Sequence, residues 1–277
     1  IFFPINTPHS PMQVPDKWWN KFENMTINEP LSEYELNHTR AAYAMVENID
    51  WNIGRIISSL KEFKLDDNTV IVFLGDNGPN GKRWNDDLKG IKGSTDEGGV
   101  KSSLIIYSPN KVVSKKVFQL ASSIDIAPTL LDLVGIKLNQ PNWDGISLLP
   151  FIENKESKIQ QRTIYQHWYG NVSVRTNNYR LDKDNVLYNI KEDPSQKNPL
   201  VNSLLMDSLI KLKNIWIEEV LSQTPNIDLR PIPVSSNKKF KNILPAKDAK
   251  IFGSDIQRSN RWPNDSFFCQ WKSKESY

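Results

Sequence analysis

The stretch TVIVFLGDNG at residues 69–78 constrains the fold of this chain more than any other segment. Its apolar, β-branched run at residues 70–74 is typical of a strand buried on both faces of a parallel sheet. The run ends in Asp76 and Asn77, and ligand sites in such sheets gather just beyond the carboxyl ends of the strands. We therefore expect an α/β fold in which chemistry takes place around these two residues.

Other patterns in the first 150 residues predict the elements around this strand. Apolar residues recur at helical spacing over residues 32–64, where Ser32 and Glu35 form a possible capping box. Residues 103–107 predict a second strand, and residues 124–134 a short capped helix. Together they predict a mixed, mostly parallel sheet flanked by helices, with a strand at residues 1–5 and a proline-broken loop after it.

Beyond about residue 150 the pattern changes to short alternating segments followed by one helix. This predicts a smaller α+β subdomain with an antiparallel sheet. The expected strands are residues 163–169, 172–176 and 179–181, and the expected helix is residues 203–221. We predict domain boundaries of 1–150, 151–225 and 226–277, with a proline- and lysine-containing linker at residues 222–250.

Composition excludes several classes of protein. The chain has 277 residues, of which 38% are hydrophobic and 24% charged, as in ordinary globular proteins. Its net charge of +3 is spread along the chain and does not indicate nucleic-acid binding. No apolar run approaches the roughly 20 residues of a membrane span. The single cysteine, Cys269, excludes an internal disulfide and a multi-thiolate zinc site, and we expect it to be a structural thiol.

Asp76 and Asn77 are candidate metal ligands. A carboxylate beside an amide oxygen offers the hard donors that Ca²⁺ or Mg²⁺ prefers. Two ligands are only part of a calcium shell of about 6 to 8 oxygens, so the rest must come from elsewhere. The alternative is a simple turn, because Asp-Asn-Gly also has high turn propensity.

The glycine-rich loop after this dipeptide carries several cations, and it is long for a compact domain. Positive side chains beside a metal suggest a site for an oxyanion such as sulfate or phosphate. The alternative is a solvated basic loop. The cations are Lys82, Arg83, Lys89, Lys92 and Lys101.

Three histidines are the remaining candidates. His9 lies between prolines that restrict its backbone, so it is either a general acid or base or a structural residue. His38 is expected on the surface of the long helix. His167 is expected to pack in its strand or to reach the rim of a pocket.

At this point the residues resemble a known family. DNGPNGKRWNDDLKGIKGSTDEGGV is similar to the second signature region of the sulfatases, and NTPHSPMQVP to their substrate-side histidine segment. SSIDIAPTLLDLVGI, DGISLLP, VRTNNYRL and LYNIKEDPSQKNPL resemble the segments that follow, in order, over roughly residues 1–200. The resemblance implies an alkaline-phosphatase-like fold and a calcium-dependent sulfuric ester hydrolase acting on aryl or carbohydrate sulfates.

The resemblance also implies roles for single residues. Asp76 and Asn77 match the calcium ligands of the family. Lys92 matches the lysine that contacts the sulfate group and supports the leaving oxygen. His9 matches the histidine near the leaving group, which helps to protonate it. Glu97 is expected to be structural, and the two glycines after it to allow tight turning.

The chain departs from the family pattern in one respect. Sulfatases use a formylglycine made in a C/S-x-P/A-x-R segment, which is not present in this sequence. The resemblance thus implies the C-terminal portion of a sulfatase, with the formylglycine in a missing N-terminal half and no turnover by this chain alone. It also implies a periplasmic or secreted protein. Residues from 243 on resemble the start of an appended module.

Two alternatives remain open at this stage. One is a phosphate-ester or phosphonate hydrolase of the same superfamily, although those zinc enzymes commonly place Asp-His where this chain has Asp76-Asn77. The other is a non-catalytic protein that binds sulfated glycans. Its binding residues would be His9, Lys92, Trp18, Trp19 and Trp84.

Overall fold

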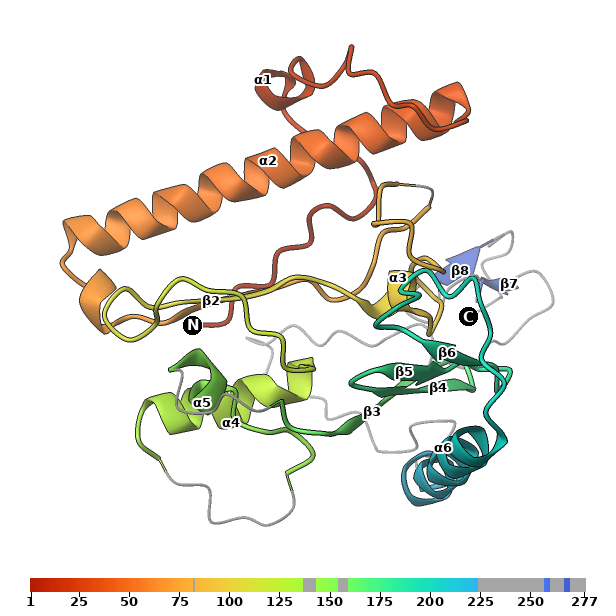
Figure 1. Ribbon diagram of the computed structural model, residues 1–277. Coiled ribbons are helices and arrows are strands. Elements are labelled where there is room, and N and C mark those ends of the chain that lie inside the picture. The colour runs from red at the N-terminus through yellow and green to blue at the C-terminus, as the bar shows by residue number, and fades with distance from the viewer. Residues whose placement is uncertain (82, 137–142, 154–158, 224–256, 260–266, 270–277) are drawn as a thin grey trace, which may run out of the picture. The chain divides into compact units, whose positions relative to one another are not determined.

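The computed structural model describes residues 1–81, 83–136, 143–153 and 159–223, and two short strands, β7 (Gln257–Ser259) and β8 (Phe267–Cys269) (Figure 1). The chain divides into two compact units, Ile1–Leu221 and Ser222–Tyr277. Nearly all of the expected linker at 222–250, and the side chain of Cys269, lie outside the described residues. The boundaries at residues 150 and 225 stay predictions.

The long amphipathic pattern forms helix α2 (Glu33–Glu62). Its start is the predicted capping box, in which Glu35 N–H donates to Ser32 Oγ at 3.3 Å and Ser32 N–H donates to Glu35 Oε2 at 2.9 Å. A 3₁₀ turn at Asp66–Asn68 follows the helix. Thus the local capping signal and the 3.6-residue period placed this helix correctly.

The N-terminal segment differs from its prediction. Residues 1–5 form no strand, because none of the described strands pairs with them. Four apolar side chains of this segment are exposed, those of Ile1, Phe2, Phe3 and Ile5. The proline-rich part contains a short helix, α1 (Asp16–Trp19), which begins directly after Pro15. Trp18 is buried there, and its ring centroid lies 5.5 Å from that of Trp51 in α2.

The Asp-Asn-Gly segment follows strand β1 (Ile71–Leu74), which pairs with β2 (Leu104–Tyr107). The pair is antiparallel, with Ile71 opposite Tyr107 and Leu74 opposite Leu104. Among the described residues these two strands have no further partner, so the expected parallel neighbours and two-sided burial are not seen. Ile105 accordingly remains 56% exposed.

One face of β2 is nevertheless packed. Leu104 and Ile106 contact a cluster formed by Leu148, Phe151 and Ile152. Most of that cluster belongs to α5 (Leu149–Ile152), which lies near α4 (Ile126–Leu133) and the 3₁₀ turn Ser123–Asp125 in Figure 1. Alternate strand residues are thus covered on one side and exposed on the other.

The second sheet confirms the expected antiparallel subdomain. Its strands follow the order β3 (Thr163–Trp168), β4 (Asn171–Thr176), β5 (Tyr179–Leu181) and β6 (Leu187–Asn189). Strand β6, at the start of the segment LYNIKEDPSQKNPL, is the one of these four that the alternation pattern did not predict.

Helix α6 (Ser203–Trp216), continued by a π-helical turn to Leu221, packs against this sheet (Figure 1). Val174, Leu181, Leu187 and Leu209 form its buried core. The mixed α/β fold class with an antiparallel C-terminal sheet is therefore confirmed. Within the described part of the chain, no helix has the length and apolar character to cross a bilayer.

Candidate functional site

The turn after β1 is fixed by backbone contacts with the segment that returns to β2. Gly75 N–H donates to Ser103 O at 3.0 Å, and Gly78 N–H donates to Gly99 O at 2.9 Å. A Cβ atom added to Gly78 would lie 1.9 Å from the carbonyl oxygen of Gly98. Only glycine therefore permits this approach, which sets the direction of the two residues between these contacts, Asp76 and Asn77.

The loop folds back so that Lys92 comes beside this turn. Lys92 N–H donates to Pro79 O at 2.9 Å. Gly93, the next residue, has a φ of +89°, which favours glycine. Added Cβ atoms at Gly98 and Gly99 would also meet backbone oxygens at 2.3 and 2.4 Å. The expected tight turning at this glycine pair thus has a physical cause.

Asp76, Asn77 and Lys92 line one cavity of about 1290 Å³. Their side chains make no hydrogen bond or ion pair with other side chains in the part of the chain that the structure describes. One carboxylate, one amide and one ammonium group are therefore free to meet a ligand. His9 is not among the residues that line this cavity.

The donor set suits a hard cation but does not complete its shell. Asp76 and Asn77 offer oxygen atoms to the cavity, as calcium and magnesium require. Among the described residues there is no cluster of three or more histidine, cysteine, aspartate or glutamate side chains that could hold a metal. The two residues thus fit part of a metal site, and their role as ligands remains a prediction.

The loop that carries Lys92 is held by the second sheet. Glu97 in α3 (Glu97–Val100) is buried, and its Oε1 accepts from Arg175 Nε at 2.6 Å and from Arg180 Nη2 at 2.8 Å. Burial by itself raises the pKa of Glu97, but the positive charges of Arg180 and Arg175 outweigh it, so the pKa lies below its usual range. The expected structural role of Glu97 has this ion pair as its basis.

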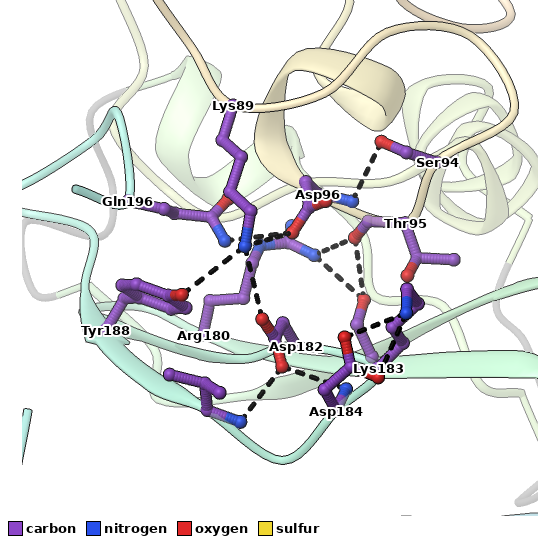
Figure 2. A network of polar contacts seen from close by, with 12 residues as sticks. Lys89, Ser94, Thr95, Asp96, Arg180, Asp182, Lys183, Asp184, Tyr188 and Gln196 are labelled. Carbon is purple, nitrogen blue, oxygen red and sulfur yellow. Dashed lines mark hydrogen bonds and ion pairs between the residues drawn. The ribbon is translucent and has the colours of Figure 1, made fainter. Parts of the chain in front are cut away.

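The same sheet binds the backbone next to Glu97 (Figure 2). Arg180 Nη1 donates to Thr95 O and to Ser173 Oγ. Gln196 receives Glu97 N–H at 3.0 Å and donates to Asp96 Oδ1 at 3.0 Å. Every one of residues 95–97 is therefore fixed by a partner from the C-terminal subdomain.

Lys89 anchors the other end of this segment. Its Nζ donates to Asp182 Oδ2 at 3.2 Å and to Tyr188 Oη at 3.3 Å, and lies 3.6 Å from Asp96 Oδ1 (Figure 2). Burial lowers the pKa of Lys89, but these hydrogen bonds and the two carboxylates raise it further, so it lies above its usual value. Lys92 sits between the two anchored ends.

The five loop cations do not form one oxyanion site. Lys92 and Lys101 line the cavity, whereas Lys89 is held by Asp182 and Arg83 contacts His38. Lys82 lies outside the described residues. The sequence therefore predicts a basic loop, but the hydrogen-bond and ion-pair partners of these side chains decide which of them line the cavity.

The histidines also differ from expectation. His38 is half-buried, with Nδ1 2.6 Å from Arg83 Nη2 and Nε2 3.4 Å from Ser10 Oγ, so it is not a bare surface residue. Burial, and next the charge of Arg83, lower the pKa of His38. His9 is exposed, and its Nδ1 lies 2.8 Å from Ser10 O. His167 lines the cavity, in agreement with the expectation that it reaches the rim of a pocket.

The three tryptophans expected to form a glycan-binding surface differ in their exposure to solvent. Trp18 is only 5% exposed and packs on Trp51, Trp19 is half-buried, and Trp84 is 77% exposed. The tryptophan that lines the main cavity is Trp168, at the end of β3, together with the aromatic residues Tyr107, Phe118 and Tyr165.

Arg175 and Arg180 are the residues of the site that sequence reasoning missed. They lie on neighbouring strands that the alternation had placed correctly. A usable signal was present, because an arginine that is buried in a packed sheet requires a carboxylate or hydrogen-bond partner.

Two family models match the chain. The model described as Sulfatase matches residues 1–136, and the model described as N-sulphoglucosamine sulphohydrolase, C-terminal, matches residues 92–222. The overlap of the two covers the loop of Lys92 and Glu97.

Individual proteins give the same result. The uncharacterized sulfatase YdeN of Escherichia coli is 28% identical over 185 residues, covering 63% of this chain and 31% of its own length. The arylsulfatase of Clostridium perfringens is 25% identical over 277 aligned residues, covering 84% of this chain and 57% of its own. The chain thus spans a third to little more than half of these curated relatives.

Solved structures extend the likeness to three dimensions. The structure of Ps i-CgsB has a TM-score of 0.63 and 30% identity, over 76% of this chain and 48% of that chain. The same protein is also solved in complex with k-i-k-neocarrahexaose, again at a TM-score of 0.63. Together with the signature loop and its surroundings, these likenesses show that the chain belongs to the sulfatase family.

Proposed function

We propose that this chain provides the metal-side and leaving-group-side residues of a sulfuric ester hydrolase acting on aryl or carbohydrate sulfate esters. The observation that carries the proposal is that Asp76, Asn77 and Lys92 line one cavity with no other side-chain partner in the described residues. An ammonium group beside oxygen donors suits a ligand that is both anionic and bound to a metal.

In this proposal each residue has one task. Asp76 and Asn77 hold Ca²⁺, or Mg²⁺ in its place, which when bound stabilises negative charge on the sulfate oxygens. Lys92 contacts the sulfate group and stabilises charge on the leaving oxygen. His9 gives a proton to the leaving alcohol, which requires its exposed segment to approach the bound substrate.

The nucleophile and the other metal ligands come from outside these 277 residues. Two observations support this: the sequence has no C/S-x-P/A-x-R segment, and the chain covers only 31 to 57% of the two curated relatives. We therefore expect no turnover by the isolated chain, and hydrolysis when an upstream half carrying a formylglycine is restored. A periplasmic or secreted location belongs to the same proposal, and cell fractionation tests it.

The test compares the complete polypeptide with this chain on 4-nitrophenyl sulfate and on a sulfated disaccharide. Lys92→Met and Asn77→Ala should each lower kcat at least about 100-fold, as loss of a group that stabilises transition-state charge does. Lys61→Met, at the exposed end of α2, is the matched control and should leave kcat unchanged. Added calcium should restore activity after chelation.

Three outcomes would contradict the proposal. Faster hydrolysis of 4-nitrophenyl phosphate together with stoichiometric bound zinc would indicate the phosphate-ester or phosphonate hydrolase. Binding of sulfated glycans without hydrolysis by the complete polypeptide would indicate a non-catalytic protein. Unchanged activity in Lys92→Met would show that Lys92 takes no part in the reaction.

A further inference from the structure

Trp168 occupies a distinctive place on the cavity wall. It is the last residue of β3, it lines the cavity, and 42% of it is exposed. A Cβ atom added to Gly93 would lie 3.6 Å from Trp168 Nε1. The indole edge is therefore in contact distance of the residue that follows Lys92 in the chain.

The hairpin that carries Trp168 is fixed before any ligand arrives. Trp168 pairs with Asn171 across the β3–β4 ladder, and Gly170 N–H donates to His167 Nε2 at 2.9 Å. Gly170 has a φ of +79°, so the tight turn depends on glycine. A preorganised aromatic side chain loses little conformational entropy when a ligand packs on it.

The indole has free surface and a free donor. Its N–H has no acceptor in the described part of the chain, and its ring contact there is with the adjacent Tyr169, at 6.0 Å between centroids. A flat apolar face with one N–H at its edge suits a ring that has both C–H groups and hydroxyls. A pyranose has both, whereas a simple aryl sulfate has no hydroxyl to accept the N–H.

The charges of the cavity indicate more than one anionic group on the ligand. Glu97, one of its two acidic lining residues, is neutralised by Arg175 and Arg180. The other, Asp76, lines the cavity together with four lysines, Lys92, Lys101, Lys115 and Lys116.

We infer that Trp168 is a sugar-stacking residue next to Lys92, and that the substrate is an oligosaccharide with more than one sulfate group. The inference rests on the proposed sulfatase function and narrows its substrate class. Trp168 binds the sugar ring, Lys92 contacts the sulfate that is hydrolysed, and the other lysines attract the remaining sulfates.

The experiment uses the complete polypeptide with Trp168→Ala, Trp168→Phe and the matched control Tyr169→Ala. Tyr169 is the adjacent aromatic residue, is exposed, and does not line the cavity. With a disulfated disaccharide, Trp168→Ala should lower kcat/KM about tenfold, mainly through KM, which corresponds to ~1.4 kcal/mol. Trp168→Phe should keep most of the activity, and Tyr169→Ala all of it.

A second substrate separates this inference from the proposed function. On 4-nitrophenyl sulfate, Trp168→Ala should retain activity within about twofold, because this substrate has no sugar ring that binds to the indole of Trp168. An equal loss on both substrates would overturn the inference and indicate that Trp168 only supports the Lys92 loop. No hydrolysis of either substrate by the unmutated polypeptide would instead overturn the proposed function.

Discussion

The Oε1 atom of Glu97 in α3 lies 2.8 Å from Nη2 of Arg180 in β5, and both side chains are almost fully removed from solvent. The two residues are separated by 83 positions in the chain. This ion pair joins the loop of the candidate site to the C-terminal sheet, so the geometry of Lys92 depends on a subdomain that carries none of the expected metal ligands.

Removal of Arg180 should destabilise the first unit strongly. Arg180→Met breaks a buried ion pair with Glu97 and removes the hydrogen bonds of Arg180 to Thr95 O and Ser173 Oγ, so we expect a loss of about 3 kcal/mol in the free energy of unfolding. The measurement is urea unfolding followed by circular dichroism. Lys183→Met, which removes an exposed ion pair with Asp184, is the control and should change little.

The cause can be checked with the double variant. Because each single variant already breaks the Glu97–Arg180 ion pair, the double variant with Glu97→Gln should lose less stability than the sum of the two single losses. Purely additive losses would show that Arg180 acts through packing rather than through its charge.

The close backbone approach at Gly78 gives a second prediction. Gly78→Ala places a Cβ atom 1.9 Å from the carbonyl oxygen of Gly98, so one of the two segments must move. We expect a loss of about 1–3 kcal/mol and faster hydrogen exchange over residues 76–99. Gly54→Ala is the matched control, because it lies in α2 with nothing within 4 Å, and should stabilise by about 0.5–1 kcal/mol. Equal effects in the two variants would contradict the steric argument.

Asp125 should contribute far more to the free energy of unfolding than Asp132, which lies nearby on α4. The fully buried Asp125 carboxylate accepts from Ser122 N–H at 2.7 Å, Ile146 N–H at 2.9 Å and Arg162 Nη1 at 2.7 Å. Asp125→Ala should cost about 3–5 kcal/mol, since Arg162 then stays buried without its carboxylate. Asp132→Ala loses one exposed hydrogen bond and should cost about 1 kcal/mol. Thermal unfolding of both variants makes the comparison.

The His38–Arg83 contact predicts a pH dependence. Arg83 donates to His38 Nδ1 only while that nitrogen is unprotonated, so the folded state favours neutral His38 and its pKa is lowered from 6.5. Stability from this contact is present above pH 6.5 and is lost as the pH falls from there through the folded-state pKa.

An NMR titration of the three histidine rings measures this pKa directly, with His38→Asn identifying the resonance. In Arg83→Met the pKa of His38 should move up toward 6.5, because the nearby positive charge is removed while the burial of the ring remains. An unchanged pKa would show that Arg83 has no part in the shift.

The sequence by itself determined the elements whose signals lie within a few residues. The capping box of α2 and the 3.6-residue apolar period located a 30-residue helix, and alternation located β3, β4 and β5. A strand followed by Asp-Asn-Gly is also a local pattern, and it made Asp76 and Asn77 candidate ligands, which stays a prediction. Capping hydrogen bonds and apolar periods depend on residues that are close in the chain, so helices and strands with these signals can be predicted without knowledge of the fold.

Tertiary structure alone decided how β1 pairs and which loop cations face the cavity. Strand direction depends on the neighbour that a strand meets, and β1 meets β2 in antiparallel register. Lys89 contacts Asp182, 93 residues away, and Arg83 contacts His38, 45 residues away. Lys92 lines the cavity and has no side-chain partner among the described residues. Such partners are chosen when segments distant in the chain pack together, because a buried charge is stable only where an opposite charge or a hydrogen bond meets it.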